Sequence, residues 1–138
     1  MNFLLDTDAV SEWVKPRPNP GLIRWMESAD EDRVYLSVIS LAEVRYGVER
    51  MPAGARRSRL EQWLRDELPI RFEARILSID QSVAEAWGKT VSRSEVLGRP
   101  MGAMDAILSA TAEIHRLTLV TRNVSDFPML KAIVNPWS

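Results

Sequence analysis

The chain has 138 residues, a net charge of −1, one histidine and no cysteine. This length predicts one domain over residues 1–138, and the absence of cysteine excludes disulfides, thiol catalysis and cysteine-based zinc sites. The near-neutral charge does not by itself indicate a nucleic-acid partner. No apolar run approaches the roughly 20 residues of a membrane span, and the N-terminus lacks a signal-peptide pattern. We therefore expect a cytoplasmic protein without membrane association.

Short apolar runs alternate with amphipathic helical patterns along the whole chain. In chain order, strands are predicted at residues 2–5, 34–37, 75–79, 118–121 and 132–134. Helices are predicted at residues 6–14, 21–28, 39–50, 55–68, around 83–91 and at 103–112. Pro69 is expected to end the helix before it, because proline lacks an N–H group. The alternation predicts a three-layer α/β/α fold with a central, mainly parallel sheet of four to five strands.

Acidic residues recur where these strands end or where the following helices begin. Asp6 and Asp126 follow predicted strands, while Glu43 and Asp105 lie near the starts of helices. In a parallel sheet, all four can converge at the carboxyl edge of the strands. Taken singly, Asp6 and Asp105 also fit helix capping, and Glu43 also fits a solvated helix surface. Asp80 is interpreted as an N-cap and is left out of the site.

Four carboxylates at one edge would repel each other, which raises some of their pKa values unless a cation is bound. Oxygen ligands without sulfur or imidazole indicate Mg²⁺, with Mn²⁺ as a possible substitute. Sites of this kind activate water and stabilise charge on a phosphate.

The motifs that carry these acids resemble those of the PIN domain, and more narrowly the VapC and FitB type of toxin nuclease. The resemblance rests on Leu-Leu-Asp-Thr at residues 4–7, Ser-x-x-Glu at 40–43, the helix of Asp105, Thr-Arg-Asn-x-x-Asp-Phe at 121–127, and Val-Asn-Pro-Trp at 134–137. It implies a Mg²⁺-dependent endoribonuclease that is the toxin of a toxin–antitoxin pair. It also implies a homodimer, inhibition by a cognate antitoxin protein, and contact with promoter DNA only through that antitoxin.

The resemblance also implies a role for each matching residue. Asp6 and Asp105 would be the chief metal ligands, with Glu43 binding the metal directly or through water. Asp126 would complete the acidic set or support a second metal. The supporting residues, which would position water, phosphate or carboxylates, are Thr7, Thr121 and Asn123. Some family members carry an acid where Asn123 stands, so the fourth acidic position is the one open to question.

Two other functions fit parts of the sequence. Asp6-Thr7-Asp8-Ala9-Val10 matches the signature of haloacid-dehalogenase-like phosphatases, but Lys89 lies in the middle of a predicted helix, Lys131 is almost terminal, and the Gly-Asp pair of that family does not occur. A PIN-like binding and dimerisation module without relevant catalysis is the other alternative, with Trp25 or Trp63 in a dimer interface. The RNA that is cleaved, the antitoxin and the number of metal ions stay open.

Overall fold

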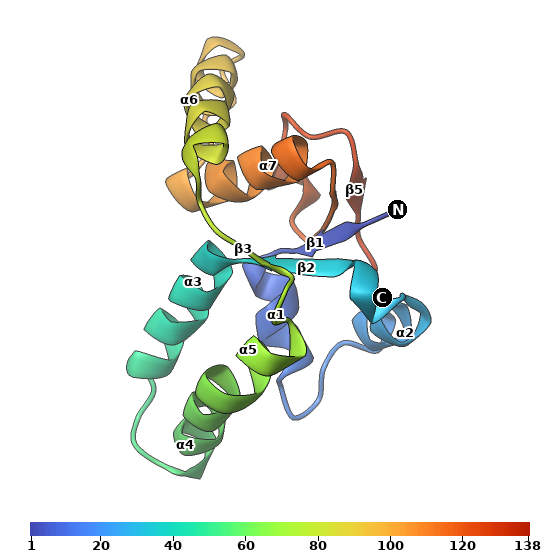
Figure 1. The fold of residues 1–138 in the computed structure, drawn as a ribbon, viewed down its shortest axis with the longest axis vertical. Coiled ribbons are helices and arrows are strands. Elements are labelled where there is room, and N and C mark those ends of the chain that lie inside the picture. Colours follow the sequence, from blue (N-terminus) through green and yellow to red (C-terminus); the bar gives the residue numbers. More distant parts are fainter.

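A parallel sheet of five short strands forms the middle layer of the computed structural model, which describes residues 1–138 (Figure 1). The strand order across the sheet is β3-β2-β1-β4-β5, and every neighbouring pair is parallel. The strands are β1 (Phe3–Leu5), β2 (Val34–Ser37), β3 (Ile76–Leu77), β4 (Thr118–Val120) and β5 (Ile133–Val134). The expected α/β architecture and parallel sheet are therefore confirmed, although every strand except β2 is shorter than predicted.

The strand order places a topological switch point beside β1. From β1 the chain adds β2 and then β3 on one side, and later adds β4 and β5 on the other side. The registers Leu4↔Tyr35 and Leu4↔Leu119 show that both neighbours lie level with the centre of β1. In open parallel sheets, the crevice at such a switch point lies beyond the carboxyl ends of the strands and is where ligands bind.

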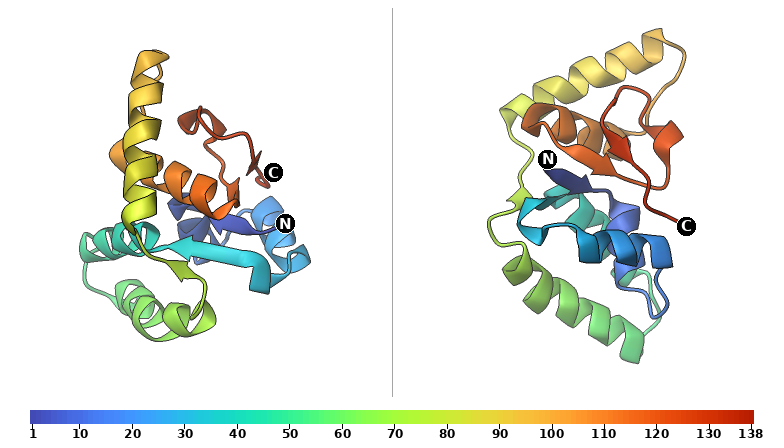
Figure 2. Two further views of the ribbon diagram at one scale, coloured as in Figure 1. Left: turned by 45° about the horizontal axis from the view of Figure 1, so that its top comes forward. Right: turned by 90° about the vertical axis from the view of Figure 1, so that its right-hand side faces the viewer.

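Helices cover both faces of the sheet, as the two views in Figure 2 show. The longer helices are α1 (Thr7–Trp13), α2 (Pro20–Ser28), α3 (Val38–Glu49), α4 (Ala55–Gln62), α6 (Gln81–Val96) and α7 (Ala103–His115). The short helical segments are η1 (Glu31–Arg33), η2 (Trp63–Glu67), α5 (Leu68–Arg71) and η3 (Val124–Asp126). None of these helices is long and apolar enough to cross a membrane.

Alternate residues of the strands point into two separate hydrophobic cores. Leu5 packs with Val10, Val44 and Phe72 on the face covered by α1, α3 and α5. Leu4 packs instead with Leu108 on the face covered by α7. Because successive side chains of a strand point to opposite faces and both faces are covered, Leu4 and Leu5 are both fully buried. The burial of Leu4 and Leu5 fixes the position of the next residue, Asp6.

The helix that starts at Ala55 does not end at Pro69, so that prediction was wrong. The chain passes from α4 through a π-helical segment, η2, in which the Leu68 N–H donates to the Trp63 carbonyl, and continues as α5 to Arg71. The wider π turn leaves Pro69 in the first turn of α5, where a missing N–H group costs little. The added turn carries Leu68 and Phe72 into the core.

Candidate active site

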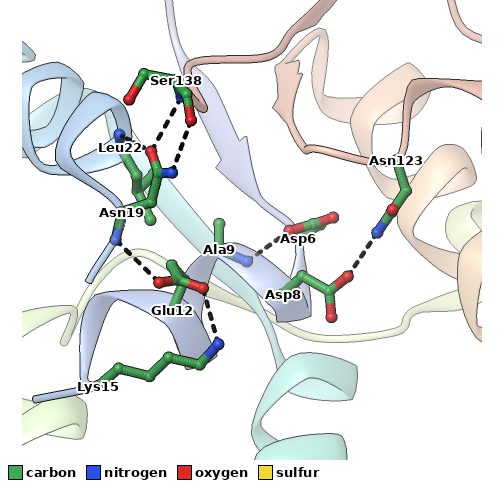
Figure 3. A network of polar contacts seen from close by, with 9 residues as sticks. All are labelled: Asp6, Asp8, Ala9, Glu12, Lys15, Asn19, Leu22, Asn123 and Ser138. Carbon is green, nitrogen blue, oxygen red and sulfur yellow. Dashed lines mark hydrogen bonds and ion pairs between the residues drawn. The ribbon is translucent and has the colours of Figure 1, made fainter. Parts of the chain in front are cut away.

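Asp6 lies directly beyond β1, at the switch point of the sheet. Its backbone N–H still pairs with the Val120 carbonyl at 3.1 Å, which continues the ladder between β1 and β4. Its carboxylate accepts a hydrogen bond from the Ala9 N–H at 2.7 Å and so caps α1 (Figure 3). The residue is only 4% exposed. Helix capping and an active-site position, which looked like alternatives in the sequence, therefore coincide at Asp6.

The second acid, Glu43, is held in place by a chain of hydroxyl groups. The Thr7 hydroxyl donates to Glu43 Oε1 at 2.6 Å and lies 3.0 Å from the Ser40 hydroxyl. Since the single proton of Thr7 is used on the carboxylate, Ser40 donates to Thr7. Ser40 and Glu43 lie on the same face of α3, and Ser40 is fully buried. The spacing in α3 thus orients Glu43 towards the end of β1.

The opposite side of the site comes from α7 and from the segment after β4. Asp105 lies in the first turn of α7, and Asp126 ends η3. In the segment after β4, the Asn123 side-chain amide donates to the carboxylate of Asp8 (Figure 3). The Asn123 N–H in turn donates to the Thr121 hydroxyl at 3.0 Å. Residues more than a hundred positions apart in the sequence are joined here.

These side chains enclose a small polar cavity of about 130 Å³. The residues that line it are Asp6, Thr7, Asp8, Glu43, Asp105, Leu108, Asn123, Asp126 and Phe127. Six of the seven predicted site residues are in this lining. Thr121, the seventh, is fully buried and contacts the site through its hydroxyl rather than lining the cavity.

Crowding and burial change the acidity of the site. Burial raises the pKa of Asp6 from 3.8 to about 6, while hydrogen bonds from Thr121 and Ala9 act in the opposite direction. Burial also raises the pKa of Asp105, and the negative charges of Asp126, Glu43 and Asp8 raise it further. The carboxylates therefore repel each other in the absence of a cation. A bound cation would reduce this repulsion.

The chemistry of this donor set fits a divalent cation. All ionisable groups in the cavity are carboxylates, and the neutral polar groups supply hydroxyl and amide oxygens, the ligand types that Mg²⁺ and Mn²⁺ prefer. No three acidic side chains are arranged as a ready ligand set around one point. Glu43 accepts a hydrogen bond from Thr7, and Asp8 accepts one from Asn123, so a bound cation would share these carboxylates with their present donors.

Asp8 is the acidic member of the cavity that sequence reasoning missed. In the sequence it appeared as part of the phosphatase-like signature, and in the structure it lies in the first turn of α1. Its charge nevertheless contributes to the raised pKa values of both Asp6 and Asp105. Its position two residues after Asp6 could have predicted its place in the site. The N-cap and the first turn of the following helix both lie at the carboxyl edge of the sheet, so Asp8 lies there as well.

An acidic cavity at the carboxyl edge of a parallel sheet is typical of enzymes that use a divalent cation to act on phosphate groups. The chain belongs to the PIN domain family, which matches residues 3–128. The haloacid-dehalogenase-like alternative is thereby set aside. PIN-domain VapC ribonucleases generally depend on a divalent metal.

Related proteins match along nearly the full chain. The toxin FitB of Neisseria gonorrhoeae is 36% identical over 136 residues, and the match covers 98% of each chain. The VapC ribonuclease Y4jK of Sinorhizobium fredii is 31% identical over 136 residues, covering 98% of this chain and 97% of the relative. The solved structure of FitAB bound to an IR36 DNA fragment superposes with a TM-score of 0.91 at 34% identity and covers 99% of this chain and 96% of that chain.

Proposed function

We propose that this protein is a Mg²⁺-dependent endoribonuclease and the toxin of a toxin–antitoxin pair. The observation that carries the proposal is the cavity in which Asp6, Glu43, Asp105 and Asp126 come together from four separate segments of the chain. Relatives named as ribonucleases support RNA as the substrate class, among them a tRNA(fMet)-specific endonuclease VapC that is 25% identical over 141 residues.

In this proposal, Asp6 and Asp105 are the chief metal ligands, because the pKa of each is raised and each gains most from a nearby cation. Glu43 binds the same ion directly or through water, and Thr7 holds its carboxylate in position. Asp126 completes the acidic set or supports a second ion. The bound cation supplies Lewis acidity and positive charge for the attack of water on a phosphodiester.

The polar neutral groups then have positioning roles. Thr121 orients Asp6 through its hydroxyl and orients Asn123 by accepting its N–H. Asn123 orients the carboxylate of Asp8. Cleavage would leave a 5′-phosphate and a 3′-hydroxyl, as the family resemblance implies.

The partner in this proposal is a cognate antitoxin protein. Solved relatives include a toxin–antitoxin complex from Klebsiella pneumoniae, FitAB bound to a DNA fragment, and VapBC bound to DNA. We propose that the antitoxin covers the acidic cavity and supplies the contact with promoter DNA, and that two copies of this chain form a homodimer.

The test is cleavage of total bacterial RNA by the antitoxin-free protein with Mg²⁺, with EDTA, and with the Asp105→Asn variant. Discrete fragments that require Mg²⁺ and fall at least about a hundredfold in the variant are expected, because one metal ligand is lost. Asp32→Asn is the matched control, since Asp32 is an exposed acid in η1 outside the cavity. Cleavage by Asp105→Asn at the control's rate would overturn the proposed site. No cleavage by a folded wild-type protein would favour the binding module instead.

A further inference from the structure

A second polar cavity of about 230 Å³ adjoins the acidic one. The two cavities share the side chains of Asp105 and Asp126, which form the wall between them. The outer cavity lies between the α6–α7 loop and the segment 125–128. A ligand bound at the acidic cavity that extends past Asp105 and Asp126 must therefore pass through the outer cavity.

Arg99 is the only basic residue in the lining of either cavity. The acids that line them number five, namely Asp6, Asp8, Glu43, Asp105 and Asp126. Arg99 is exposed, and its guanidinium takes part in none of the ion pairs or side-chain hydrogen bonds of the structure. It differs in this respect from Arg57, Arg71 and Arg75, whose guanidinium groups are all bound to neighbours.

The backbone at Arg99 is nevertheless held in a defined conformation. Helix α6 ends with Gly98 in the left-handed region at φ +71°, which favours glycine. The Gly98 N–H donates to the Glu95 carbonyl at 3.0 Å, and the Arg99 N–H donates to the Ser94 carbonyl at 2.8 Å. This pair of bonds is the Schellman motif. Because Ser94 is fully buried, Arg99 projects from a fixed point at the edge of the outer cavity.

We propose that Arg99 is a substrate-positioning residue that binds the RNA phosphate next to the scissile one, in the outer cavity. The inference rests on the proposed ribonuclease function. A guanidinium group matches phosphate oxygens with two parallel N–H donors, and phosphate contacts fix the register of a nucleic acid without reading its sequence. The strand would run from the acidic cavity past Asp105 and Asp126 to Arg99.

A purely structural alternative is that Arg99 only offsets the charge of Asp105 and Asp126. In that case its removal would change thermal stability but not the number of phosphates that the protein contacts. The salt dependence of RNA binding separates the two, because its slope reports contacts between cations and phosphates.

The experiment measures binding of a short single-stranded RNA of mixed sequence, labelled with a fluorophore, by the antitoxin-free protein in Ca²⁺. The variants are Arg99→Ala and Arg99→Lys. The control is Arg93→Ala, since Arg93 is an exposed arginine in the last turn of α6 and lines neither cavity. We expect Arg99→Ala to lower affinity by roughly five- to tenfold and to reduce the slope of log K against log salt by about 0.7. Arg99→Lys should keep the slope, because the charge remains, and recover part of the affinity.

A second readout uses cleavage. If Arg99 binds a phosphate that does not react, Arg99→Ala should raise KM while kcat changes little. An Arg99→Ala variant that matches Arg93→Ala in affinity, slope and KM would overturn the inference and leave the nuclease function standing. RNA binding that depends on Arg99 in a protein that does not cleave would overturn the nuclease function, and with it the placement of the bound phosphate beside a scissile one. No salt-dependent RNA binding by the wild-type chain would overturn both.

Discussion

The raised pKa of Asp6 makes a sharp prediction about the metal-free protein. An ionised carboxylate that moves from a pKa of 3.8 to about 6 on folding destabilises the folded state by about 3 kcal/mol once the pH exceeds both values. Asp6→Asn removes this charge and keeps the helix cap, because asparagine caps as well as aspartate. The variant should therefore be more stable than the wild type near neutral pH, by up to that amount.

The sign of the effect gives its pH dependence. Well below pH 3.8, Asp6 is protonated in both the folded and the unfolded chain, and the penalty is absent. Between about pH 4 and about pH 6, Asp6 is ionised in the unfolded chain but still largely protonated in the folded chain, so the destabilisation grows as the pH rises. Above that range the destabilisation reaches its full value. The stability gap between Asp6→Asn and the wild type should open over the same range.

The assay is thermal unfolding in EDTA at about pH 4 and about pH 7.5. For 138 residues, an unfolding entropy of about 2.1 cal/mol/K per residue converts 3 kcal/mol into a rise in Tm of about 10 °C at the higher pH. Adding Mg²⁺ should raise the Tm of the wild type more than that of the variant and so narrow the gap, because a ligand stabilises the state that binds it.

Asp80→Asn is the matched control. Asp80 caps α6 by accepting the Val83 N–H at 3.0 Å, as Asp6 caps α1, but it is exposed and lies outside the acidic cavity. Its variant should show no gap that opens with pH. An Asp6→Asn protein no more stable than the wild type near neutral pH, or a gap of equal size at both pH values, would refute the reasoning.

Two further predictions concern the hydroxyl chain and the assembly. Thr7→Val should lower RNA cleavage by about 10- to 100-fold with a stability loss of about 1–3 kcal/mol, because Glu43 loses its donor and the Ser40 hydroxyl its acceptor. Thr118→Val in β4, whose hydroxyl makes no hydrogen bond in the structure, is the control, and an equal effect of both variants would contradict the orienting role of Thr7. Light scattering at micromolar concentration should give the mass of a dimer, twice 15.7 kDa, and a monomer would contradict the proposed assembly.

The convergence of the acids could be predicted because it depends on local signals and one general rule. Leu4 and Leu5 indicate a buried strand, Asp6 marks its end, and the parallel-sheet rule places the ends of neighbouring strands together. Asp105 and Asp126 were placed by the same argument. The Asp80 cap was also correct, because a capping side chain acts within its own turn.

What could not be predicted depends on contacts between distant segments. The hydrogen bond from Thr7 to Glu43 joins residues 36 positions apart, and the bond from Asn123 to Asp8 joins residues 115 apart. Neither has a sequence signature. The tryptophans considered for a dimer interface are packed within the chain, Trp25 against Phe3 at 5.0 Å and Trp63 against Trp13 at 6.3 Å between ring centroids. Amphipathic spacing marks such residues as partly buried but does not say against which surface.

The central position of β1 also has a consequence for biosynthesis. Until β4 pairs with it, β1 is an edge strand. Before that pairing, Asp105 and Asp126 cannot take their places beside Asp6. A growing chain therefore acquires β1, β2 and β3, and with them Asp6 and Glu43, long before it can close the acidic cavity. Non-local pairing of this kind is also slow to form. A chain that stalls or is cleaved before residue 118 therefore lacks the complete acidic cavity, and we expect it to lack the proposed nuclease activity.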